Sequence, residues 1–279
     1  MEFTKMVASG DDFILFNGIT HDIDNYSRLA VKACNRHFSF GAKGILICEY
    51  SHEADIKMLY FNSEGFEEDI GASGIRCFAK YVYEEGLVKK EVFTVETIAG
   101  IKNVFLEIDQ NKKVVSVKVN MGRPILDARL IPVDIDRKRA IEETIEINGK
   151  TYTFSSVLVG VPHTVIFVDD ISKVDINELG RKIEIHSIFP KKTNVNFVEI
   201  IDESNIIIYT WEIGVGRTLS SIAGSCAGVV IGNLLGKLTN TVQVRTETEE
   251  LEIQIGADGE IYSKGTVNKI CDGILYISW

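Results

Sequence analysis

Two runs of small residues, each followed by an apolar segment, are the places where this sequence is best suited to chemistry. The first run begins at Gly71 and the second at Ser221. We expect each run to form the first turn of a helix, where unpaired backbone amides and the helix dipole attract an anion. The residues expected to bind a ligand at these turns are Ser73, Gly74, Ala223 and Gly224.

Four side chains are candidates for proton transfer, namely Asp11, Lys43, His163 and Ser221. A desolvated carboxylate acts as a base when its pKa is raised, and a lysine does so only when its pKa falls well below the ordinary ~10.4. A serine hydroxyl needs an activating base. Structural roles stay open for all four. Asp11 could be a turn residue and Lys43 a solvent-facing side chain, while His163 could be structural and Ser221 a helix N-cap.

Hydrophobic periodicity and turn signals predict the elements that position these residues. Asp24 or Asn25 caps the first helix, Gly86 ends the second, and Asp175 opens the third with a capping box. The helices are expected at 24–37, 73–85, 175–186 and 221–238. The strands are expected at 3–8, 13–17, 45–50, 57–62, 92–96, 101–108, 114–121, 152–160, 164–169, 194–201, 205–212, 241–246, 251–255, 261–262, 267–270 and 275–279.

The chain divides into two similar halves at Gly122-Arg123-Pro124. In each half, strands lead to a Gly/Ser-rich turn and then to one apolar helix. This order predicts a duplicated unit in which strands surround a central helix. The segment 222–235 is apolar on all sides, so it belongs inside the protein.

Composition narrows the classes of function. The 279 residues are 45% hydrophobic and 25% charged, and the net charge of −10 argues against general nucleic-acid binding. No stretch approaches the roughly 20 apolar residues of a membrane span, and the N-terminus lacks an apolar signal core, so we expect a cytoplasmic protein. The five cysteines and five histidines show no metal-ligand spacing, and no phosphate-binding glycine loop is present, so no metal is expected.

Seven segments carry a set of short motifs, at 5–13, 36–41, 61–65, 120–124, 160–163, 189–190 and 193–197. They resemble motifs of the diaminopimelate epimerase family, which opens with Lys-Met-His-Gly-Leu-Gly-Asn-Asp-Phe and carries Asn-Met-Gly-x-Pro and Gly-Asn-Pro-His. The resemblance covers nearly the whole chain.

The resemblance implies an α/β (α+β) fold of two pseudo-symmetric lobes, each a mostly antiparallel sheet or barrel around a central helix. The N-terminal lobe would comprise 1–124 plus 268–279 and the C-terminal lobe 125–267, with the site between them. No cofactor is expected. The partners would be a small-molecule amino acid or carboxylate and a second copy of the chain in a homodimer, with no nucleic acid and no membrane.

The resemblance also implies which residues have changed. The family's two catalytic cysteines fall on Gly71 and Ser221, so this chain is identified as a divergent member that lacks both. Substrate-contacting positions of the family are matched by Asn62, Asn194 and Glu212. Other positions differ from the family's pattern. Arg217 replaces a glutamate, Ile213 an arginine and Val161 an asparagine, while Asp11 stands at a family asparagine, Gly44 at a frequent glutamine and Lys43 at an aspartate.

Three functions remain open from the sequence. The first is a cofactor-independent isomerase of an amino acid or related small carboxylate, without the two-thiol mechanism. Such a reaction needs a base on one face of the α-carbon, an acid on the other and donors to the carboxylate. The second is a non-catalytic binding protein, in which Arg217 would attract a carboxylate or phosphate. The third is a diaminopimelate epimerase of lysine biosynthesis. With Gly71 and Ser221 at the cysteine positions, we expect a changed or lost activity.

Overall fold

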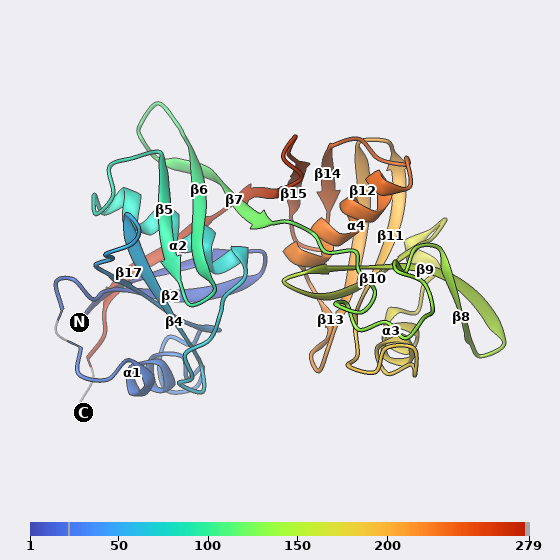
Figure 1. Cartoon of the computed structure of the whole chain (residues 1–279). Helices are drawn as coiled ribbons and strands as arrows, with labels where there is room; N and C mark the ends of the chain where they lie inside the picture. Colours follow the sequence, from blue (N-terminus) through green and yellow to red (C-terminus); the bar gives the residue numbers. More distant parts are fainter. Residues whose placement is uncertain (22, 277–279) are drawn as a thin grey trace. The chain divides into compact units, whose positions relative to one another are not determined.

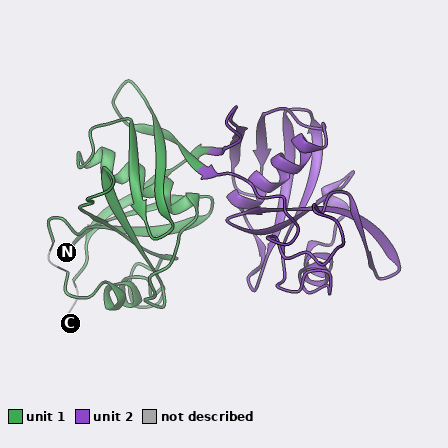
Figure 2. Ribbon diagram, in the orientation of Figure 1, with its two compact units in different colours: residues 1–120, 264–279 green, residues 121–263 purple. Residues whose placement is uncertain are grey.

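The computed structural model describes residues 1–21 and 23–276, which form two compact units. Unit 1 comprises residues 1–120 and 264–279, and unit 2 comprises residues 121–263 (Figure 2). The borders that we expected, after 124 and before 268, lie a few residues from these. The fold is mixed α/β, with many strands and few helices (Figure 1).

Unit 1 contains two longer helices between paired strands. Its sheet pairs β2 with β3 and β4 with β5 in parallel, while β1–β2, β3–β4, β5–β6 and β6–β7 are antiparallel. The elements are β1 (Glu2–Ala8), β2 (Asp11–Asn17), α1 (Tyr26–Ala33), β3 (Gly44–Glu49), β4 (Ile56–Asn62), α2 (Ala72–Glu84), β5 (Val92–Thr97), β6 (Gly100–Ile108), β7 (Val114–Gly122) and β17 (Asn268–Ile274).

Unit 2 repeats this plan. Its sheet pairs β10 with β11 and β12 with β14 in parallel, while β9–β10, β11–β12 and β14–β15 are antiparallel. The elements are β8 (Glu143–Ile147), β9 (Lys150–Val159), β10 (Val161–Phe167), η1 (Ile171–Lys173), α3 (Ile176–Glu184), β11 (Asn194–Asp202), β12 (Asn205–Glu212), β13 (Gly216–Thr218), α4 (Ile222–Leu234), β14 (Thr241–Arg245) and β15 (Glu250–Ile255). A further strand, β16 (Ile261–Thr266), begins in unit 2 and ends in unit 1.

The two units share one order of strand pairings and helices, which confirms the predicted duplication. In each unit, an antiparallel pair is followed by a helix, a second antiparallel pair, a second helix and a third pair. Gly71 and Ser221 occupy equivalent places, because they are the N-caps of α2 and α4. The two small-residue runs are therefore structurally equivalent, because each forms the N-cap and first turn of a corresponding helix.

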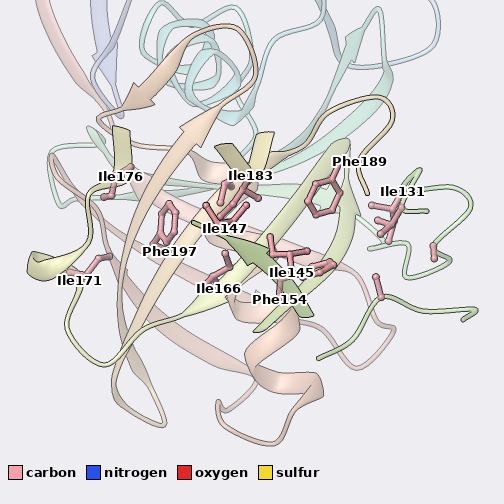
Figure 3. Close-up of a cluster of buried hydrophobic side chains, with 14 residues drawn as sticks. Ile131, Ile145, Ile147, Phe154, Ile166, Ile171, Ile176, Ile183, Phe189 and Phe197 are labelled. Carbon is pink, nitrogen blue, oxygen red and sulfur yellow. The ribbon is translucent and has the colours of Figure 1, made fainter. Parts of the chain in front are cut away.

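The sheet of unit 2 presents different faces to its two helices. One face packs against α3 through the cluster in Figure 3, where Phe154, Ile166 and Phe197 meet Ile176 and Ile183. The other face packs against α4, which contacts β9, β10, β11, β12 and β15. Because side chains alternate along a strand, the neighbours of these core residues point towards α4.

Helix α4 is buried along most of its length, as its apolar character predicts. Its end differs from our expectation of residue 238. The helix stops at Leu234, and Gly236 follows with a positive φ of 69°. Glycine adopts this conformation at little cost and so favours helix termination there. Helix α2 ends as predicted, with Gly86 at a φ of 72°.

The first helix is shorter than predicted, although its cap is correct. Asn25 accepts a hydrogen bond from the amide of Arg28, and the helix ends at Ala33 rather than at residue 37. The reason is Asn35, whose side-chain oxygen accepts hydrogen bonds from the amides of His37 and Phe38. Such a turn competes with continued helix. Asp175 also caps α3 as expected, by accepting from the amide of Glu178.

The C-terminal strand differs from the prediction. A single strand, β17, runs to Ile274 and pairs antiparallel with β1, so the chain returns to unit 1. The strand predicted at 275–279 is wrong for Leu275 and Tyr276, which belong to no strand, and its last three residues lie outside the described residues. The short strand β13 was not predicted, because the Gly214 and Gly216 region reads as a turn.

Candidate functional site: two helix N-termini

The start of α2 is the candidate half-site of unit 1. Its N-cap, Gly71, makes no side-chain hydrogen bond to the first turn, and a Cβ placed on Gly71 would meet no atom within 4 Å. The amide of Gly74 donates to the carbonyl of Gly71 at 3.1 Å, whereas the structure gives Ala72 and Ser73 no such backbone acceptor among the described residues. Ala72 and Ser73 therefore carry the amides best placed to bind an anion.

The side chains of Asp11, Lys43 and Ser73 meet at this helix start. The Ser73 hydroxyl donates to Oδ2 of Asp11 at 2.9 Å, and Nζ of Lys43 donates to Oδ1 at 2.8 Å. The Asp11 side chain is 29% exposed, so the carboxylate is only partly desolvated. Lys43 is half exposed and held as the ion-pair partner of Asp11.

Asn62 is occupied by its own turn. Its side-chain oxygen accepts from the amides of Glu64 and Phe66, and its nitrogen donates to Glu68 at 2.7 Å. Asn62 pairs with Gly44 across β3 and β4, and so lies next to Lys43 in the sheet. Its position beside the Asp11 cluster suits a binding residue, but its acceptor oxygen is already used.

The start of α4 is the candidate half-site of unit 2, and here the N-cap is a side chain. The Ser221 hydroxyl accepts from the amide of Gly224 at 3.3 Å. The structural alternative that the sequence left open for Ser221 is therefore present. Because the cap uses the Gly224 amide, Ala223 offers the freer amide of the two that were predicted to bind a ligand.

A polar row crosses the sheet beneath this first turn. Asn196 on β11 donates to Nδ1 of His163 at 3.2 Å and to the carbonyl of Thr164 at 3.2 Å. Thr210 on β12 donates to the Asn196 oxygen at 3.0 Å. The helix packs directly on this row, since a Cβ placed on Gly224 would lie 2.2 Å from Oδ1 of Asn196. Gly224 is needed for this close approach.

His163 is buried and neutral. The carbonyl of Thr164 only accepts hydrogen bonds, so Asn196 must present its nitrogen on that side and Nδ1 of His163 must be the acceptor. The ring proton is then on Nε2, a buried atom with no hydrogen-bond partner in the part of the chain that the structure describes. Burial lowers the pKa of His163 to about 4, against a smaller opposing effect of Asn196. At neutral pH the residue is a hydrogen-bond donor rather than a cation.

Three other predicted binding residues lie on the strands of unit 2. Asn194 is used structurally, because it donates to the carbonyl of Pro162 and accepts from the amide of Ile213. Arg217 is not a free cation, since its Nε donates to Glu247 at 2.8 Å and its guanidinium lies over the Tyr209 ring. Glu212 has no side-chain partner among the described residues.

No cysteine of the described chain lies at either helix start. Cys77 and Cys226 are fully buried within α2 and α4, and burial raises the pKa of Cys226 to about 12. Cys34 and Cys48 are also buried, and Cys271 alone of the described cysteines is exposed. Among residues 1–21 and 23–276, no three His, Cys, Asp or Glu side chains are placed to hold a metal ion.

The sequence reasoning missed Asn196 and Thr210, although one signal was available. Asn196 lies two residues after Asn194 on a strand, and residues two apart share a face. The polar pattern of Thr193-Asn194-Val195-Asn196 could therefore have indicated that a second asparagine points towards the helix.

None of the described helices combines the length and the apolarity needed to cross a bilayer.

The two-unit α/β fold is also that of solved structures, among them a phenazine biosynthesis protein and a hydroxyproline epimerase. Solved structures share it over nearly the whole chain. A phenazine biosynthesis protein of the PhzF family from Bacillus anthracis aligns with a TM-score of 0.69 at 15% identity and covers 99% of both chains. A hydroxyproline epimerase from Agrobacterium vitis aligns with a TM-score of 0.64 at 13% identity and covers 98% of this chain and 90% of its own.

The chain belongs to the diaminopimelate epimerase family. The family model "Diaminopimelate epimerase" matches residues 3–126 and 155–270. A diaminopimelate epimerase of Caldanaerobacter subterraneus subsp. tengcongensis is 47% identical over 99% of this chain and 100% of its own length. One of Alkaliphilus metalliredigens is 42% identical over 98% of this chain and 97% of its own.

Proposed function

We propose that this protein is a cofactor-independent isomerase that inverts the α-carbon of diaminopimelate or of an amino acid close to it. The observation that carries the proposal is the full-length likeness to proteins named diaminopimelate epimerase, at 47% and 42% identity. These relatives favour diaminopimelate over the broader class of amino acids that the sequence alone suggested.

The helix starts supply the charge stabilisation that this reaction needs. Negative charge grows on the substrate carboxylate as the α-proton leaves, and backbone amides aimed at that charge lower the barrier. The freer amides are those of Ala72 and Ser73 on α2 and of Ala223 on α4. Nε2 of His163 is a further donor, since it carries a proton and has no partner among the described residues.

Proton transfer in this proposal uses oxygen groups in place of thiols. Asp11 is the base in unit 1, because its carboxylate is the acceptor at the start of α2. Before Asp11 can accept the substrate proton, it must break its hydrogen bond with Ser73 or with Lys43. Ser221 is the acid in unit 2, because its oxygen accepts from the Gly224 amide and its hydroxyl proton stays available for transfer.

A second candidate is a binding protein without catalysis. The observation in its favour is that the candidate acid–base groups already have partners: Asp11 is held by Lys43 and Ser73, and Ser221 caps its helix. Such a protein would keep the amides that bind a carboxylate and lack the groups that move a proton.

Deuterium exchange separates the two candidates. The purified protein is incubated with diaminopimelate in heavy water, and exchange at the α-carbon is followed by NMR or mass spectrometry. Exchange that disappears in Asp11→Asn and persists in Glu53→Gln, an exposed carboxylate of the same unit, supports the isomerase. Binding by calorimetry without exchange supports the second candidate, and neither binding nor exchange contradicts both.

A further inference from the structure

The C-terminal end of α2 lies beside a pocket that the proposed activity does not use. The pocket has a volume of about 430 Å³ and lies entirely within unit 1. It is formed by the ends of β1, β2 and β17 together with the last turn of α2. The residues that line it are Glu2, Phe3, Thr4, Asn17, Thr20, His21, Tyr81, Glu85, Asp272, Gly273 and Ile274.

The positive charge beside the three carboxylates of this pocket does not balance their negative charge. Lys269 serves two of them, at 2.7 Å from Asp272 and only 3.8 Å from Glu85. Glu2 has no side-chain partner within the described chain. The last turn of α2 contains no basic residue, although its carbonyl ends carry the negative end of the helix dipole. The pocket therefore favours a cation.

Tyr81 provides a second, independent indication of a ligand. Its side chain lines the pocket and is only 8% exposed, yet its hydroxyl has no hydrogen-bond partner in residues 1–21 and 23–276. Burial raises the pKa of Tyr81, and the acidic groups around it, Glu85 among them, raise it further. The phenol therefore stays neutral, with its oxygen free to accept a hydrogen bond. The Tyr81 hydroxyl is therefore available to a ligand that enters the pocket.

The arrangement suits an organic ammonium group. The described acidic and histidine side chains form no cluster that could hold a metal ion, so the carboxylates are too dispersed for one small cation. An ammonium group has three donors, which can be shared among a carboxylate, the Tyr81 hydroxyl and a helix carbonyl. Phe3 and Ile274 add apolar surface for a short carbon chain.

We propose that the pocket between Tyr81, Glu2, Glu85 and Asp272 binds an aliphatic amine through its ammonium group, with a diamine favoured because its two charges meet separate carboxylates. This site differs from the proposed catalytic site, which lies at the opposite end of α2. The 13-residue helix separates the two ends by about 20 Å.

The test is calorimetric titration of the full-length protein with 1,5-diaminopentane. We expect binding in the millimolar range or tighter, weakened by added salt because the carboxylates are partly exposed. The uncharged analogue 1,5-pentanediol should not bind. Glu85→Gln and Tyr81→Phe should each weaken binding about tenfold. Lys269→Met should strengthen it, since Lys269 competes for the same carboxylates.

Two control variants locate the binding. Glu53→Gln removes an exposed carboxylate elsewhere in unit 1 and should leave the affinity unchanged. Asp11→Asn alters the other end of α2 and should also leave it unchanged, so this result does not depend on the proposed activity. The proposal is overturned if the diamine does not bind, if the diol binds equally well, or if Glu85→Gln, Glu2→Gln and Tyr81→Phe, each confirmed as folded by its thermal unfolding, all bind like the unchanged protein.

Discussion

The side-chain nitrogen of Asn196 lies 3.2 Å from Nδ1 of His163 and holds the imidazole beneath the first turn of α4. This contact determines which ring nitrogen carries the proton. It also ties the histidine to the helix start, because Gly224 packs against the same asparagine. A change at either residue should therefore affect both the stability of unit 2 and the chemistry at α4.

Loss of Asn196 should destabilise the protein. Asn196→Ala removes the partner of His163 and of Thr210 and leaves buried polar groups unpaired. We expect the free energy of unfolding to fall by about 1–3 kcal/mol, as for other unsatisfied buried groups. Chemical denaturation measures the change. The matched control, Asn205→Ala on the same sheet but exposed, should change stability far less; equal effects would contradict a special role for the buried network.

The burial of His163 should make the stability of the folded protein depend on pH. The pKa of His163 is about 4 in the folded protein and 6.5 for an unperturbed histidine, so the unfolded chain binds more protons between these values. Stability from this group is fully present above pH 6.5 and declines as the pH falls towards 4. The loss should reach about 2 kcal/mol between pH 7 and pH 5. Denaturation at both pH values, compared with His163→Gln, isolates this contribution from that of the carboxylates, and identical slopes would argue against it.

Gly224 should tolerate an added methyl group far less well than Gly71. In Gly224→Ala the new Cβ would meet Asn196 at 2.2 Å and Thr210 at 3.0 Å, so the helix must shift. We expect destabilisation of about 1–3 kcal/mol, typical of overpacking. In Gly71→Ala no atom lies within 4 Å, and the φ of −66° suits alanine. Thermal unfolding of the two variants gives the comparison, and a larger loss for Gly71→Ala would refute the packing argument.

Two cysteines placed at the helix starts should increase the proposed isomerase activity. Gly71→Cys has open space for its side chain, and a thiol at a helix N-terminus has a lowered pKa. Because each acid–base group contributes roughly 10²–10⁴-fold, the double variant Gly71→Cys/Ser221→Cys should interconvert LL- and meso-diaminopimelate at least about 100-fold faster than the unchanged protein. The single variants should gain much less. An inactive but folded double variant that still binds diaminopimelate would show that these positions are not the proton-transfer sites.

The residues Val161 and Ile213 should reduce the preference for a charged distal group. A pocket without an arginine or an asparagine there leaves a distal carboxylate desolvated and unpaired. The protein should therefore bind diaminopimelate only slightly more tightly than amino acids with an uncharged tail in a thermal-shift or calorimetric screen. Ile213→Arg should strengthen the preference for diaminopimelate. If Ile213→Arg leaves this preference unchanged, the altered-specificity prediction is wrong.

Local signals in the sequence were sufficient for most of the fold. Asn25 and Asp175 cap their helices through their side chains, and Gly86 ends a helix through its backbone conformation. Each acts on helix positions within a few residues, so its role is visible in the sequence itself. The same holds for the burial of α4, because a helix that is apolar on all sides has no face suited to water. The duplication was also visible, since each half repeats the order of strands, turn and helix.

Tertiary structure decided the states of the candidate site residues. Whether Asp11 is free or paired depends on Lys43, 32 positions away, and on Ser73, which is 62 positions away. The proton on His163 depends on Asn196 from another strand. The residue types at a turn determine which chemical groups are present there, and the sequence alone established these residue types. The partners that set the hydrogen bonding, burial and charge of those groups come from distant segments, and only the folded chain brings them together.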